Sequence, residues 1–179
     1  TRIDKSTITA TSVCGHYAHL VAQRAVDGDE ATQFHSNPFT SIGYGDVYFS
    51  FSQEKVIDRV HVLTRPNSLG RIQNYTLLYK ESSEDEWMEV AQCLMDGIAG
   101  NWRNVHFKPV LAKELCVRVT KGNDDHVLIY ETEFFRYNRL YDTLMECFTD
   151  ETKTSLVDKV DLEYLRYLRT LLADTAEYN

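Results

Sequence analysis

The chain has 179 residues, of which 43% are hydrophobic and 26% are charged, and this size and composition are typical of a folded globular protein with one domain, with or without an appendage. Its 27 acidic and 19 basic residues give a formal net charge of -8, and such a field repels phosphate backbones, which argues against nucleic acid as a partner. No stretch approaches the roughly 20 consecutive apolar residues that span a bilayer, so we expect no membrane insertion.

Short apolar segments that alternate with polar residues run from residue 7 to residue 137, and clusters of Gly, Asn, Asp and Ser separate them. This pattern is typical of β-strands, with Val60 and Val62 facing inward and Arg59 and His61 on the other face. Because no helical period interrupts the series, it predicts an antiparallel β-sandwich of seven or more strands. The expected strands are residues 47–51, 56–63, 74–80, 88–93, 105–107, 115–120 and 127–137.

After residue 137 the apolar period changes from two to about 3.6 residues, which predicts two short helices. Helices this short are marginal in isolation. We therefore divide the chain into a sandwich over residues 1–137 and a helical segment over residues 138–179, which either packs on the sandwich or begins a further domain. The apolar positions of the two helices are Leu140, Leu144, Phe148, Leu162, Leu165, Leu168 and Leu172.

Four cysteines are spread widely along the chain, at Cys14, Cys93, Cys116 and Cys147, and none belongs to a CxxC pair. This spacing is not that of a zinc ribbon or a dithiol redox motif. Two disulfides and four buried thiols both remain open, and the position of Cys116 in an alternating strand favours thiols.

Three segments resemble the F5/8 type C, or discoidin-like, superfamily, and they occur in the family's order. Residues 25–36 (AVDGDEATQFHS) resemble its first signature, residues 60–79 resemble its central Arg-Pro and Gly-Arg-Ile stretch, and residues 129–135 (IYETEFF) resemble its last strand. Among members of the superfamily, the chain is most similar to bacterial family 32 carbohydrate-binding modules. The resemblance implies a jelly-roll, galactose-binding-like sandwich that binds terminal galactose- and N-acetylgalactosamine-type sugars.

The resemblance also implies a structural Ca²⁺ held by Asp27, Asp29, Thr32 and Glu131. Carboxylate and hydroxyl oxygens are the ligands that this hard cation requires. A turn in which Asp27 bonds only the amides of its own loop is the alternative.

The same resemblance places the sugar contacts at His35 and Arg65. Leu69 stands where the family has Asn, so Asn67 is the expected substitute, and Phe39 and Tyr44 are the candidates for a ring on which a sugar stacks. An imidazole, a guanidinium and an amide together can donate to and accept from neutral hydroxyl groups. The alternative is that His35 and Arg65 only stabilise their loops.

No Ser-His-Asp set, phosphate loop or HExxH motif can be singled out, so we expect a binding module and not an enzyme. The tail resembles a segment of secreted enhancin-like, mucin-degrading metallopeptidases, which implies a secreted or surface protein that the module tethers to glycans or glycoproteins. We expect a monomer within a larger multidomain protein. The alternatives are a discoidin-like module that binds protein or lipid, and a degenerate structural module.

Overall fold

The computed structural model describes residues 2–40, 42–66, 69–94 and 100–136. The predicted helices at 138–179, as well as Asn67 and Cys147, lie outside the described residues. In the described part, none of the helices has the length and apolar character needed to cross a membrane. The elements are η1 (Lys5–Thr7), β1 (Ile8–Ser12), η2 (Ala22–Val26), β2 (Phe34–His35), β3 (Gly45–Thr64), β4 (Ile72–Lys80), β5 (Met88–Leu94), β6 (Trp102–Gly122) and β7 (Leu128–Phe135).

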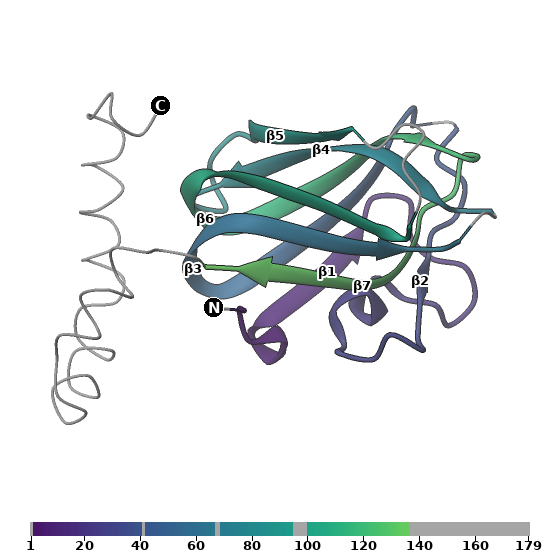
Figure 1. The fold of residues 1–179 in the computed structure, drawn as a ribbon, viewed down its shortest axis with the longest axis horizontal. Coiled ribbons are helices and arrows are strands. Elements are labelled where there is room, and N and C mark those ends of the chain that lie inside the picture. Colours follow the sequence, from purple (N-terminus) through teal and green to yellow (C-terminus); the bar gives the residue numbers. More distant parts are fainter. Residues whose placement is uncertain (1, 41, 67–68, 95–99, 137–179) are drawn as a thin grey trace, which may run out of the picture.

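Two long strands, β3 and β6, build both layers of the sandwich. They run antiparallel to each other, turn together at one end of the molecule and return in the other layer (Figure 1). Register shifts between Ser50 and Lys55 and between Ile57 and Arg59 mark the turn in β3. The first half of β3 pairs with β1 and the second half with β7, while β4 pairs with β6 and carries β5 at its edge.

The core lies between the two layers and is closed by edge-to-face aromatic contacts. Phe134 of β7 contacts Phe49 and Phe51 of β3, with ring centroids 5.0 and 5.3 Å apart. All three side chains are buried. Because these rings come from strand segments in opposite layers, their contact joins the layers in addition to burying apolar area.

The mainly β, antiparallel sandwich predicted from the sequence is confirmed. Val60 and Val62 are buried as expected, and Arg59 and His61 lie on the half-buried outer side. The strand boundaries were partly wrong, because residues 47–51 and 56–63 belong to one strand, as do 105–107 and 115–120, and β1 and β2 were missed. Cys14, Cys93 and Cys116 are free thiols.

The loops at the end of the sandwich that carries β2 are tied to one another through Gly70. The Gly70 N–H donates to the Asp124 carboxylate at 3.1 Å, and the Gly70 carbonyl accepts from the Leu128 N–H at 3.0 Å. Gly70 has a φ of +79°, and a Cβ at this position would lie 2.6 Å from the Leu128 Cβ. Only glycine therefore fits here, and the loop after β3 is held against the start of β7.

We predict that Gly70→Ala destabilises the fold by about 3 kcal/mol or more, because it adds a steric clash to the left-handed backbone penalty of about 1–2 kcal/mol. Gly43→Ala is the matched control, since Gly43 has a φ of +88° and a Cβ added there would meet no atom of the described residues within 4 Å. It should cost only the backbone penalty. Urea unfolding of both variants measures the difference, and equal losses would show that the contact with Leu128 is unimportant.

Candidate functional site

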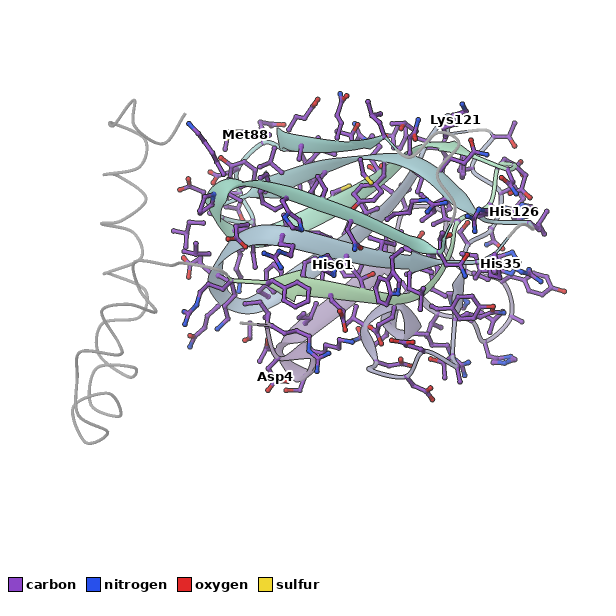
Figure 2. All side chains as sticks on the ribbon, in the orientation of Figure 1. Asp4, His35, His61, Met88, Lys121 and His126 are labelled. Atoms are coloured by element: carbon purple, nitrogen blue, oxygen red, sulfur yellow. The ribbon has the colours of Figure 1, made fainter. Side chains whose placement is uncertain are left out.

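His35 lies at the centre of the loop cluster. In β2 it pairs with Leu128 of β7. Its N–H donates to the Leu20 carbonyl at 3.1 Å, and its own carbonyl accepts from the Tyr17 N–H at 2.8 Å. Its ring is 5.5 Å from the His126 ring in an edge-on contact and 5.7 Å from the Tyr17 ring. Figure 2 shows His35 and His126 together at this end of the sandwich. The half-buried imidazole is therefore held by backbone bonds and flanked by two rings.

Arg65 follows β3 directly and is held by a buried arginine of the same loop end. The Arg71 guanidinium donates to the Arg65 carbonyl at 2.7 Å, to the Asn101 side-chain oxygen at 2.9 Å and to the Gly100 carbonyl at 2.6 Å. Arg71 therefore fixes the backbone at Arg65, whose side chain is half-buried.

The positive charge of Arg65 affects the pKa of the His35 imidazole. Burial lowers the pKa of His35 below its ordinary value of 6.5, the positive charges of His126 and Arg65 lower it further, and Asp124 acts in the opposite direction. The imidazole is therefore neutral at neutral pH. A neutral imidazole has one donor and one acceptor nitrogen, which is what a sugar hydroxyl needs.

The loop that precedes β7 completes the cluster. Asp124 accepts from the N–H groups of Gly70 and His126, and Asp125 accepts from the Thr40 hydroxyl. The His126 Nδ1 lies 3.1 Å from an Asp125 carboxylate oxygen. The ligand atoms of Asp124, Asp125 and His126 lie within 4.8 Å of one another, which is close enough for them to share a metal ion. The same two carboxylates also fix the loops at this end of the sandwich.

The aromatic candidates occupy three different environments. Phe39 packs against the core, and a Cβ on Gly45 would lie 2.9 Å from its ring. Tyr44 is 38% exposed, and the Arg118 guanidinium covers its ring at 4.5 Å. Tyr17 is 62% exposed and lies beside His35. Tyr17 is therefore the ring best placed for a ligand at His35, and it was missed by the sequence analysis.

The segment Asp27–Thr32 forms a tight loop after η2. Asp27 accepts from the Asp29 N–H at 3.0 Å and from the Thr32 hydroxyl at 2.5 Å, and Asp29 accepts from the Ala31 N–H at 2.9 Å. A turn closed by Asp27, which the sequence offered as the alternative to a cation site, is thus present. These bonds fix the loop and leave its carboxylates exposed to solvent.

Glu131 of β7 faces this loop from the core. Its side chain is 1% exposed, one carboxylate oxygen accepts from the Thr132 N–H at 3.1 Å, and the Lys5 ammonium lies 3.1 Å from the same oxygen. Burial raises the pKa of Glu131, Lys5 lowers it, and the charge of Asp27 raises it. The second oxygen, Oε2, is buried and has no hydrogen-bond partner among the described residues. Such an orphaned oxygen beside an acidic loop fits a hard cation.

Neither Tyr17, Arg71 nor Lys5 was singled out from the sequence. Tyr17 and Lys5 lie outside the three segments on which the resemblance depends. Arg71 lies within one of them, but its bonds to Asn101 and Gly100 span about thirty residues. The residues around Tyr17, Arg71 and Lys5 are mostly small or polar, and they form no periodic pattern that would mark these three positions as functional.

Comparison with known protein families gives a match to the F5/8 type C domain over residues 7–132. A search of curated proteins finds no match. Among solved structures, the chain is similar to the Clostridium perfringens module CpGH89CBM32-5 in complex with GalNAc-β-1,3-galactose, with a TM-score of 0.66 and 16% identity over 76% of this chain and 100% of that chain.

Two further C. perfringens structures have the same fold. The family 32 module of NanJ in complex with galactose has a TM-score of 0.64 and 18% identity, over 76% of this chain and 98% of that chain. The CBM32-1, CBM32-2 and M60 catalytic domains of ZmpB give a TM-score of 0.70 and 19% identity, over 99% of this chain and 19% of that chain. The galactose-binding-like sandwich expected from the sequence is therefore the fold of this chain.

We predict that Arg65→Ala raises the pKa of His35 toward 6.5, because it removes a positive charge that opposes protonation of the imidazole. His126→Ala should act in the same direction. The titration of the His35 ring protons followed by NMR measures both shifts. An unchanged His35 titration in Arg65→Ala would mean that the two side chains do not share a site.

Proposed function

Because the chain belongs to the F5/8 type C domain family, we propose that its sandwich is a non-catalytic module that binds terminal galactose- or N-acetylgalactosamine-type glycans at the His35 cluster. The observation that carries this proposal is the joint placement of a neutral imidazole, a guanidinium and an exposed aromatic ring at one loop end. Solved structures with this fold contain galactose and GalNAc-β-1,3-galactose.

Each group in the cluster has a distinct role in sugar recognition. His35 and Arg65 hydrogen-bond hydroxyl groups, and the fork of a guanidinium suits two neighbouring oxygens. Tyr17 offers a face against which the apolar side of a sugar ring packs. Asn67, predicted as a further amide contact, follows Arg65 by two residues, and we keep it in the proposed site.

The proposed role of the module is to tether a secreted or surface enzyme to glycans or glycoproteins. The match to ZmpB, in which such modules accompany an M60 catalytic domain, supports a place in a larger protein. A shallow site on one module binds weakly, but linkage to further binding modules converts weak affinity into avidity. The module therefore needs selectivity for its glycan more than high affinity.

We also propose that Ca²⁺ binds between the Asp27–Thr32 loop and β7, held by Asp27, Asp29, Thr32 and Glu131. The ion would supply the second positive partner that the orphaned Glu131 oxygen lacks. Since the loop ends three residues before His35, a cation at this position would stabilise the segment that leads into the sugar site.

A second candidate function is binding of a lipid surface or protein by the same loop end. Exposed apolar side chains support it, because Tyr17 and Ile42 lie in the loops around β2 and Leu69 lies beside Gly70. The net charge of -8 opposes an anionic membrane. Binding to phosphatidylserine vesicles without binding to sugars would favour this second function.

We predict that Arg65→Ala weakens binding of N-acetylgalactosamine by about 1.5–3 kcal/mol, or roughly 10- to 150-fold, because charge-assisted hydrogen bonds are lost. Stability should change by about 0.5 kcal/mol or less at this loop position. Arg2→Ala is the charge-matched control, since Arg2 lies at the opposite end of β7. Calorimetric titration measures affinity, and equal binding by both variants would remove Arg65 from the site.

We predict that excess Ca²⁺ raises the melting temperature and that EDTA reverses the effect. A ligand bound only by the native state adds about 2.7 kcal/mol at a hundredfold excess over its Kd. Asp27→Ala and Glu131→Ala should abolish the gain. A melting temperature that responds to neither Ca²⁺ nor EDTA would contradict the cation assignment.

A further inference from the structure

The segment before β1 is fixed along β7, and its position determines what lies beside Glu131. Arg2 forms an antiparallel bridge with Phe135, and the Ile3 N–H donates to the Phe134 carbonyl at 2.8 Å. Asp4 then caps η1 by accepting from the Ser6 N–H at 2.9 Å. The register of this segment thus places Lys5, the first residue of η1, over the middle of β7.

Lys5 lies between the candidate cation loop and the buried carboxylate. Its ammonium is 3.1 Å from the Glu131 carboxylate and 3.8 Å from that of Glu133. Its stem runs beside the loop, because a Cβ on Gly28 would lie 4.0 Å from the Lys5 Cδ. The Lys5 side chain is only 17% exposed. It is therefore a largely desolvated cation at the carboxylate that Ca²⁺ would use.

The geometry points to Lys5 as a built-in competitor of Ca²⁺, with its ammonium as the counter-ion of Glu131 in the metal-free protein. This inference rests on the cation site proposed above. A buried carboxylate without a positive partner is costly. Lys5 supplies that partner through one oxygen, while Oε2 remains without a partner among the described residues and Asp27 adds a second negative charge nearby.

The competition follows from charge. A divalent cation on Glu131 would lie next to the Lys5 ammonium, and two like charges at this distance repel strongly in a site that little water reaches. Binding of Ca²⁺ is therefore weaker while the ammonium stays at the carboxylate. Lys5 thus lowers the affinity for Ca²⁺ and, in return, lets the module fold without it.

The test compares the wild-type chain with Lys5→Met, which keeps most of the stem and removes the charge. Arg2→Ala is the matched control, because Arg2 also pairs with a β7 glutamate, Glu133 at 2.9 Å, but does not contact Glu131. Calorimetric titration with CaCl₂ and melting curves in EDTA and in excess Ca²⁺ are recorded for each protein, with N-acetylgalactosamine binding measured in parallel.

We expect Lys5→Met to bind Ca²⁺ at least about tenfold more tightly than the wild type, because the repulsion is gone. In EDTA its melting temperature should fall by roughly 10 °C, and Ca²⁺ should restore it, since Glu131 is left without a counter-ion. Arg2→Ala should behave like the wild type. If Lys5→Met fails to fold in EDTA, recovery of metal-independent folding by Lys5→Met combined with Glu131→Gln supports the same conclusion.

Equal Ca²⁺ affinity of the wild type and Lys5→Met would overturn the competition while leaving the cation site standing. Failure of all three proteins to bind Ca²⁺ would overturn both the competition and the cation site. In neither case is the proposed glycan binding affected, because the parallel sugar titration decides it separately. A double variant that stays unfolded would show that Lys5 is needed for packing and would also overturn the inference.

Discussion

The pairing of β3 with β6 is the constraint on which the rest of the structure depends. The two strands have 20 and 21 residues and remain partners through both layers of the sandwich. The layers cannot slide past each other without breaking this ladder. It also fixes β7, which pairs with the second half of β3. Strand β7 begins with Leu128, which pairs with His35, continues through Glu131 and ends with Phe135, which pairs with Arg2.

Both candidate sites therefore derive their geometry from one strand. Buried arginines then fix the loops that connect the strands at the end of the sandwich that carries β2. Arg71 and Arg103, both nearly inaccessible, donate to the Gly100 carbonyl at 2.6 and 3.0 Å. Charge-assisted bonds of this kind are strong where water is excluded. Loops fixed in advance lose little entropy when a ligand binds, which leaves more of the contact energy for affinity.

The sequence predicted those features that are local in the chain. Alternation identified the inward face of β3, and the motifs selected His35, Arg65 and the Asp27 loop as candidate site residues. The polar run at residues 52–55 was interpreted as a break, whereas β3 continues through it on the way from one layer to the other. The contact of Lys5 with Glu131 joins residues 126 positions apart. No local pattern encodes such a contact, because it depends on the register of the first segment on β7.

The charge distribution also favours one class of ligand for the His35 cluster. The whole chain carries a formal charge of -8, so anionic ligands and anionic surfaces are repelled at long range. At short range, burial lowers the pKa of His35 and the neighbouring Arg65 lowers it further, so the imidazole is unprotonated at neutral pH. A neutral sugar is not affected by the long-range repulsion, and it can use both the donor and the acceptor of the imidazole. A neutral imidazole beside a guanidinium is therefore suited to an uncharged, hydroxyl-rich ligand.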